Sequence, residues 1–246
     1  MEAVKIAREK DIEYVYDENG LARIPVLQGE YEGAAFERIG LKAGSVWKPE
    51  GYRFGDKMQF FIFSRGTGYI TTPEKAYNID EISIFIPRFD EETFAVTAAS
   101  NLYMLHIIAE FADYDRRYMA ERRITLPRFR KTSEAWTYWE NFKNEGVVSR
   151  MFIEHRQLGR FSMGIVTGKG PDLVGEHVHH ELEQWYYFLP GAKVTYYAGG
   201  ESLEAAEGDV TYTRRGIPHG SRAEEGEAFD YIWFEIAHDG YPGTIS

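Results

Sequence analysis

The residues of this sequence best suited to chemistry lie in the segment Gly175–Gly191. It places His177 and His179 one residue apart, and Glu183 and Gln184 follow just before an aromatic run. Residues i and i+2 of an extended strand point to the same face, so both imidazoles can converge on one point. Neutral imidazole is the commonest protein ligand for metals, and a carboxylate or amide oxygen is suited to complete a site for a first-row metal. The segment therefore predicts a metal site.

The composition restricts what else the protein does. The 246 residues contain no cysteine, so any metal must be held by nitrogen and oxygen ligands, and a disulfide-stapled secreted domain is excluded. The formal net charge of -11 argues against non-specific binding to nucleic acid or to an anionic membrane surface. No signal peptide is recognisable, and every apolar run is far shorter than a membrane span. We therefore expect a soluble, cytoplasmic protein.

The elements that must position this site are predicted to be strands. Short β-type runs, rich in aromatic and β-branched residues, recur from 34 to 109 and again from 147 to 236. Each is bounded by Gly, Pro, Asp or Asn at short spacing, which is typical of an all-β sandwich or barrel.

The segment between these two β-rich regions has a different character. It is charged, and Ser133 is placed as an N-cap before Trp136, Trp139 and Phe142, which fall at helical spacing. We expect a short amphipathic helix in a linker, with the aromatic stripe as its packing face.

The two β-rich regions are related as a repeat. At a constant offset of 125 residues, a glutamine, an apolar-rich run and a glycine recur in both. The matched pairs are Phe36 with Phe161, Gln59 with Gln184, Phe63 with Phe188, and Gly66 with Gly191.

A second motif completes the metal site and carries a family resemblance. A strand that opens with a Gly-Asp pair ends in a Gly/Pro turn that presents a histidine. The two motifs together read His177-x-His179-x4-Gln184-x6-Gly191 and Gly208-x7-Gly216-x2-His219. This order and spacing resemble the paired motifs of the cupin superfamily. The resemblance implies antiparallel barrels of jelly-roll topology, and with the repeat it implies two tandem cupin barrels.

The resemblance also implies a ligand set of His177, His179, His219 and a Glu or Gln. Family spacing favours Gln184, whereas strand alternation turns its neighbour Glu183 to the opposite face; Glu183 remains the alternative. A neutral glutamine leaves the metal its full divalent charge, which favours Lewis-acid chemistry. The expected cofactor is one divalent transition metal, namely Mn, Fe, Co, Ni, Cu or Zn.

The first barrel departs from the family pattern. The counterparts of the first two histidine ligands are Tyr52 and Phe54, only Gln59 remains, and the second motif has no histidine. We expect no metal there, and interpret this barrel as a structural or dimerising half that allows a homodimer. The predicted organisation is therefore an N-terminal extension, a metal-free cupin, a linker with a short helix, and a metal-binding cupin. Their bounds are 1–30, 31–110, 111–147 and 148–246.

Two tyrosines are the candidate catalytic residues. Tyr186 and Tyr212 are expected to line the barrel interior and to act as acid or base, since the pKa of a tyrosine can fall beside a metal. His106 and His155 are interpreted as structural histidines. The function predicted is an isomerase, lyase or hydrolase acting on a small keto acid or sugar-acid-like substrate. A metal-dependent dioxygenase and a non-enzymatic binding protein are the alternatives.

Overall fold

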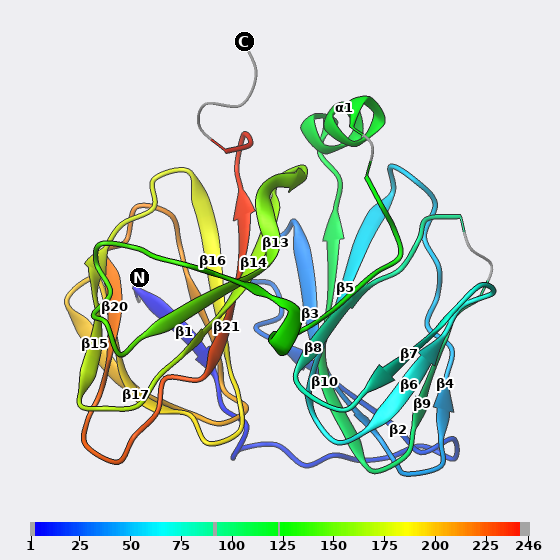
Figure 1. Cartoon of the computed structure of the whole chain (residues 1–246), viewed down its shortest axis with the longest axis horizontal. Helices are drawn as coiled ribbons and strands as arrows, with labels where there is room; N and C mark the ends of the chain where they lie inside the picture. The colour runs from blue at the N-terminus through cyan, green and yellow to red at the C-terminus, as the bar shows by residue number, and fades with distance from the viewer. Residues whose placement is uncertain (1–2, 91–92, 123, 242–246) are drawn as a thin grey trace. The chain divides into compact units, whose positions relative to one another are not determined.

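The computed structural model describes residues 3–90, 93–122 and 124–241, and almost all of its regular structure is β-strand. The described residues form one α-helix, α1 (Asp113–Glu121), and one 3-10 turn, η1 (Thr132–Glu134). The chain divides into two compact units, Glu13–Glu134 and the combination of Met1–Ile12 with Ala135–Ser246. The all-β prediction with two tandem barrels is confirmed (Figure 1).

The unit Glu13–Glu134 packs a six-stranded antiparallel sheet against a four-stranded one. The first sheet has the order β11-β8-β5-β10-β3-β2 and the second β4-β9-β6-β7. A cluster of buried aromatic and aliphatic side chains, Phe61, Phe63, Ile70 and Phe85 among them, forms its core. The strands are β2 (Leu21–Val26), β3 (Ala34–Leu41), β4 (Val46–Trp47), β5 (Lys57–Arg65), β6 (Gly68–Thr71), β7 (Ala76–Ile79), β8 (Ser83–Ile86), β9 (Ala95–Ala98), β10 (Leu102–Glu110) and β11 (Arg128–Lys131).

The second unit repeats this arrangement with a seven-stranded and a four-stranded sheet. Their orders are β1-β19-β16-β21-β14-β13-β12 and β15-β20-β17-β18. The central order β19-β16-β21-β14 corresponds to β8-β5-β10-β3 of the first unit, so the matched glutamines stand on equivalent strands. The strands are β1 (Val4–Ala7), β12 (Trp136–Tyr138), β13 (Val148–Leu158), β14 (Phe161–Thr167), β15 (Asp172–His177), β16 (Leu182–Phe188), β17 (Lys193–Ala198), β18 (Glu201–Ala206), β19 (Val210–Thr213), β20 (His219–Ala223) and β21 (Tyr231–Ala237).

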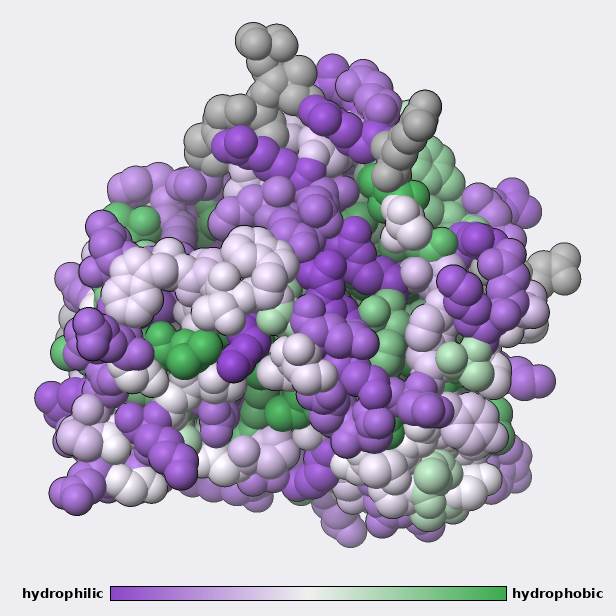
Figure 2. All heavy atoms as spheres, viewed as in Figure 1, coloured by the Kyte–Doolittle hydropathy of each residue, from purple (hydrophilic) through white to green (hydrophobic). Residues whose placement is uncertain are grey.

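The cores of both units are apolar. The face seen in Figure 2 is largely hydrophilic, with small apolar areas between charged side chains. Strands β5 and β16 are buried along almost their full length. For this reason their sequences are continuous apolar runs rather than alternating ones.

The N-terminal residues are divided between the two units, whereas the sequence predicts a separate extension. Instead of a single extension over 1–30, β1 pairs with β19, and the chain from Glu13 onward joins the first barrel. The Asp209 carboxylate anchors this segment, since it accepts hydrogen bonds from Arg8 Nη1 (2.9 Å) and from the Glu9 N–H (2.9 Å). A pairing between residues 200 positions apart leaves no local signal in the sequence.

The predicted linker helix is wrong in its position. The helix lies earlier, at α1, whereas Trp136–Tyr138 forms the edge strand β12 against β13. Trp136 and Trp139 are 49% and 60% exposed, so they do not form a packing face. Backbone pairing with β13 outweighs the helical spacing of the aromatic residues, as tertiary context commonly does.

The anchoring of β1 predicts a stability effect. Asp209→Ala should lower the free energy of unfolding by about 1–3 kcal/mol, because it removes the buried carboxylate that accepts the part-buried hydrogen bonds from Arg8 and the Glu9 N–H. Urea unfolding measures this difference. Asp113→Ala, which removes an exposed ion pair with Arg116 on α1, is the control and should change little. Equal stability of the two variants contradicts the anchoring role.

Candidate metal centre

Three histidines converge in the second unit. One ligand atom from each of His177, His179 and His219 lies within 4.8 Å of the other two. The ring centroids of His177 and His219 are 4.5 Å apart. The cause is strand pairing: His177 ends β15, His219 begins β20, and the two residues are direct partners in the antiparallel register. Two motifs separated by about 40 residues in the sequence are therefore adjacent in the sheet.

The backbone selects which ring nitrogen of two histidines is available. Nδ1 of His177 lies 2.9 Å from the Gly175 carbonyl oxygen, and Nδ1 of His219 lies 2.9 Å from that of Ile217. A carbonyl only accepts, so each Nδ1 carries the proton and each Nε2 keeps its lone pair. Nε2 of His219 is buried without a hydrogen-bond partner. An unpartnered buried acceptor of this kind is the arrangement expected of a metal ligand.

Burial also keeps these rings neutral. It lowers the pKa of His177 to about 3 and the pKa of His219 to about 4. Neutral imidazole is the form that binds metal, so both ligands are ready for a cation at neutral pH.

The structure separates the two candidates for the oxygen ligand. Gln184 lines the cavity beside the histidines, and its Oε1 is buried without a hydrogen-bond partner. Glu183 lies on the opposite face of β16, where its carboxylate accepts from Tyr212 Oη (2.8 Å) and from the Arg215 N–H (3.2 Å). Of the two, only Gln184 presents an oxygen to the same cavity.

The two candidate catalytic tyrosines lie in different places. Tyr186 lines the cavity and stacks on Tyr231, with ring centroids 4.5 Å apart. Tyr212 pairs with Trp185 in the β16–β19 register and stacks on its ring, so it lies on the face turned away from Gln184. The structure does not bring Tyr212 to the site, because its partner Trp185 is next to Gln184 in the chain and successive strand residues point to opposite faces.

The surroundings of Tyr186 affect its acidity. Burial raises the pKa of Tyr186 well above its ordinary value. In this environment the phenol stays protonated at neutral pH, so it is suited to donate a hydrogen bond rather than to act as a base.

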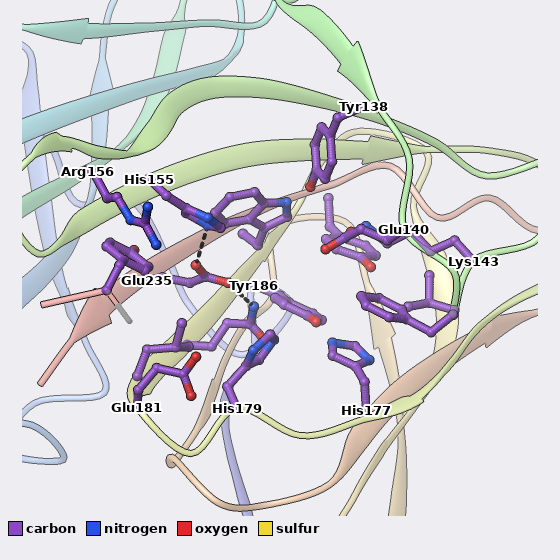
Figure 3. A pocket seen from close by; sticks show the side chains of 17 residues that line it. Tyr138, Glu140, Lys143, His155, Arg156, His177, His179, Glu181, Tyr186 and Glu235 are labelled. Carbon is purple, nitrogen blue, oxygen red and sulfur yellow. Dashed lines mark hydrogen bonds and ion pairs between the residues drawn. The ribbon is translucent and has the colours of Figure 1, made fainter. Parts of the chain in front are cut away.

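The cavity has a volume of about 500 Å³ and contains groups that the sequence did not reveal (Figure 3). These are Glu140, Lys143, His155, Arg156 and Glu235. They come from the segment before β13, from β13 itself and from β21, which are distant from both motifs. The only available signal was the unusual charge density of the linker, and it does not indicate which charges face inward. His155, interpreted as structural, lies at the cavity with a half-exposed side chain.

The segment before β13 covers the histidine cluster. The ring of Phe142 stacks on His177 at 4.0 Å between centroids. Next to it, Nζ of Lys143 forms an ion pair with Glu140 and donates to Ser149 Oγ (2.8 Å). Burial lowers the pKa of Lys143 despite the neighbouring carboxylate. The linker therefore supplies a buried ammonium group to the cavity.

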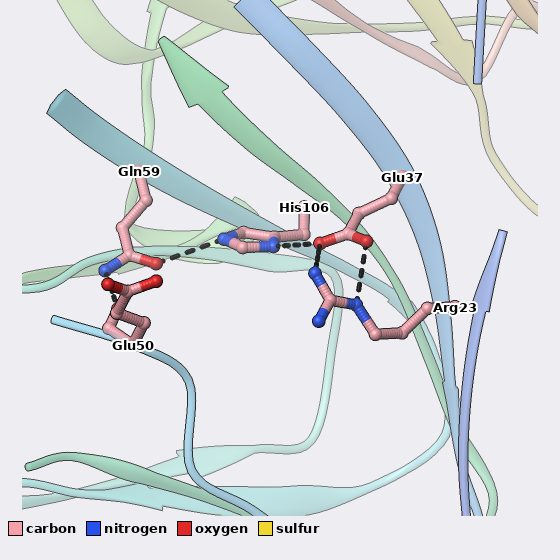
Figure 4. Close-up of polar contacts among 5 residues, drawn as sticks. All are labelled: Arg23, Glu37, Glu50, Gln59 and His106. Atoms are coloured by element: carbon pink, nitrogen blue, oxygen red, sulfur yellow. Dashed lines mark hydrogen bonds and ion pairs between the residues drawn. The ribbon is translucent and has the colours of Figure 1, made fainter. Parts of the chain in front are cut away.

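The equivalent region of the first unit contains a network of hydrogen-bonded polar side chains (Figure 4). Gln59 donates through Nε2 to the Glu50 carbonyl oxygen (2.8 Å), and its Oε1 faces His106 Nε2 at 3.1 Å. His106 Nδ1 lies 2.8 Å from Glu37, which also binds Arg23. Among the residues described, the histidine cluster of the second unit is the one group of His, Asp or Glu ligands that converges in the manner of a metal site.

Comparison with known proteins identifies the fold. Residues 166–235, which contain all four candidate ligands, match the family model of the Cupin domain. A comparison with curated protein sequences gave no match. The part of the chain that the structure describes has no helix long and apolar enough to cross a membrane.

Solved structures agree over nearly the whole chain. A Pseudomonas aeruginosa crystal structure, described as that of a glyoxylate-induced protein, is 13% identical with a TM-score of 0.77, covering 100% of this chain and 92% of its own. A Cupin 2 conserved barrel domain protein from Leptotrichia buccalis is 14% identical with a TM-score of 0.63, covering 96% and 98%. A variant of Bacillus subtilis oxalate decarboxylase is 12% identical with a TM-score of 0.69, covering 96% and 78%.

At these identities the similarity shows the fold. The match to the Cupin domain over residues 166–235 and the fold shared with these structures support the resemblance to the cupin superfamily. The converging histidines further support a cupin-type metal-binding protein.

The depressed pKa values predict how the metal-free protein responds to acid. Between about pH 6.5 and pH 4 the unfolded chain takes up protons on His177 and His219, whereas the folded protein does not. The free energy of unfolding therefore decreases as the pH is lowered through this range. His219→Gln should reduce the number of protons taken up on unfolding by about one in this range. The measurement is the pH dependence of the unfolding constant in chelator-treated protein. His180→Gln, at an exposed position, is the control; an unchanged slope in His219→Gln contradicts the prediction.

Proposed function

We propose that this protein is a metal-dependent enzyme whose single divalent transition metal is held by His177, His179, Gln184 and His219. The observation that carries the proposal is the set of buried, unpartnered acceptors, Nε2 of His219 and Oε1 of Gln184, beside two further imidazoles. Leaving such acceptors unsatisfied is costly unless a ligand binds them. All four donors are neutral or amide groups, which suits Mn, Fe, Co, Ni, Cu or Zn.

The proposed reaction class follows from the charge of the ligands. Four neutral ligands leave the cation its full charge, which when bound supplies Lewis-acid polarisation of a substrate oxygen. We therefore propose an isomerase, lyase or hydrolase reaction on a small oxygenated substrate of the keto-acid or sugar-acid type. A cavity of about 500 Å³ accommodates such a molecule. The similarity to oxalate decarboxylase, named for another small oxygenated acid, is consistent with this class.

The chain's own groups give the cavity two buried proton donors. The Tyr186 phenol stays protonated, and the Lys143 Nζ group lies over the Phe142 ring that stacks on His177. Either group can hold a substrate oxygen, or deliver a proton to one, from the wall of the cavity. The Phe142 ring covers His177 and limits water there. Tyr186 retains its proposed catalytic role, whereas Tyr212 does not line this cavity.

The first barrel is proposed to be the metal-free half of a bicupin. Its glutamine oxygen is already used by His106, so no unpartnered acceptor remains at Gln59. We propose a structural or dimerising role for this unit.

The first test is metal content. Protein purified without added metal should contain about one transition metal per chain by elemental analysis, because the acceptors described above need a ligand. His177→Ala should lose it. Protein without metal, or with unchanged metal in His177→Ala, contradicts the site.

The identity of the oxygen ligand is tested by a pair of neighbouring variants. Gln184→Ala should weaken metal binding about 10–100-fold, whereas Glu183→Ala should leave it unchanged, because Glu183 lies on the other face of β16. Isothermal titration with Co²⁺ measures both. The reverse result assigns the ligand to Glu183.

The reaction class is tested with a panel of keto acids, uronates and oxalate in an oxygen-electrode cell. We expect product formation without oxygen consumption, and a lower kcat with unchanged metal content in Tyr186→Phe. Oxygen uptake that matches substrate loss contradicts the Lewis-acid class and supports a dioxygenase. Binding without turnover across the panel supports a non-enzymatic binding protein.

A further inference from the structure

A buried carboxylate lies directly beside the proposed glutamine ligand. Glu235 on β21 is the register partner of Gln184 on β16, so both side chains leave the sheet on the same face. Glu235 is 4% exposed, and its Oε1 accepts a hydrogen bond from Gln184 Nε2 at 2.7 Å. A charge-assisted hydrogen bond between buried partners is among the stronger ones in proteins.

This bond determines which end of the amide faces the histidines. An amide carries one oxygen and one NH2 group, and a carboxylate accepts only. With the NH2 group held by Glu235, the Gln184 oxygen must point away from Glu235. That oxygen is buried and has no hydrogen-bond partner. Figure 3 shows Glu235 on the wall of the cavity that also contains His177 and His179.

A second titratable residue, His155, lies beside Glu235 without a hydrogen bond to it. Oε2 of Glu235 lies 3.4 Å from His155 Nε2, and the His155 ring stacks on Tyr241 with centroids 4.5 Å apart. His155 lies in a stretch of β13 between Ile153 and Leu158 where the register with β14 shifts. Such irregularities commonly redirect a side chain, and this one brings an imidazole to the Glu235 carboxylate.

The equivalent glutamine of the first unit has the opposite arrangement. Gln59 gives its NH2 group to the backbone of Glu50, and His106 takes its oxygen. The register partner of Gln59 on β10 is Ile108, so no carboxylate stands where Glu235 stands. A carboxylate, Glu235, is therefore present beside Gln184, whose oxygen has no partner, and is absent beside Gln59, whose oxygen has one.

We propose that Glu235 is the positioning residue that fixes the Gln184 amide with its oxygen toward the histidine cluster. The inference rests on the proposed metal site. Glu235 itself is outside the converging ligand group, which consists of His177, His179 and His219. Its role is to orient a ligand and thereby strengthen metal binding.

The test compares two substitutions at the same position. Glu235→Gln keeps an oxygen that accepts from Gln184, whereas Glu235→Leu removes every acceptor. Co²⁺ is titrated into the metal-free full-length protein, and its affinity is obtained by competition with a chelator. We expect Glu235→Leu to weaken binding about 10–100-fold and Glu235→Gln to retain affinity within about tenfold. The visible spectrum of bound Co²⁺ should indicate the loss of one oxygen ligand in Glu235→Leu and in no other variant of this pair.

Two controls separate orientation from general damage. Glu183→Leu removes a carboxylate of similar burial from the other face of β16 and should leave Co²⁺ affinity unchanged. Gln184→Glu provides two equivalent oxygens and needs no orientation, so adding Glu235→Leu to it should cost little affinity. Circular dichroism of each metal-free variant reports folding.

The outcomes separate a failure of the positioning role from a failure of the proposed metal site. Wild-type protein that binds no Co²⁺ overturns the metal site itself. Wild-type binding with unchanged affinity and spectrum in Glu235→Leu overturns only the positioning role. Equal loss in Glu235→Gln and Glu235→Leu, with the same spectral change, also overturns it, since Glu235 then acts as a ligand. If the cost of Glu235→Leu persists in the Gln184→Glu background, orientation of the amide is not the cause.

Discussion

The pairing of β15 with β20 is the constraint on which the rest of the site depends. It sets His177 directly opposite His219, and the Gly175 and Ile217 carbonyls then fix both rings with Nε2 available. Burying these imidazoles depresses their pKa values, so the cluster is neutral and costly to leave without a ligand. A cation is the natural partner for acceptors arranged in this way.

The two units show how one strand framework carries two kinds of polar chemistry. In both, a glutamine stands on the central strand of the larger sheet, at Gln59 and at Gln184. In the first unit the neighbouring strands add His106 and Glu37, and every polar end of this chain finds a protein partner. In the second they add Glu235, which uses only the NH2 group and leaves the oxygen available. The difference lies in a few inward-facing residues rather than in the fold.

The groups around the cavity come from elements that carry no motif. Glu140 and Lys143 precede β13, His155 lies where its register shifts, and Glu235 lies on the strand opposite Gln184. Their placement follows from long-range antiparallel pairing, which assembles sites from distant segments. The motifs define the proposed metal site, whereas these residues shape the cavity beside it.

The sequence by itself determined the all-β class, the repeated barrel and the three histidines, because strand periodicity and turn residues are local signals. It also placed Gln184 and Glu183 on opposite faces, since alternation along a strand depends only on chain geometry. The tertiary structure alone decided that β1 joins the second unit and that Trp136–Tyr138 is a strand. It also decided that Tyr212 faces away from the cavity while Glu235 and His155 face it. These outcomes depend on which strands pair and in what register, and that choice is made by packing between segments far apart in the chain.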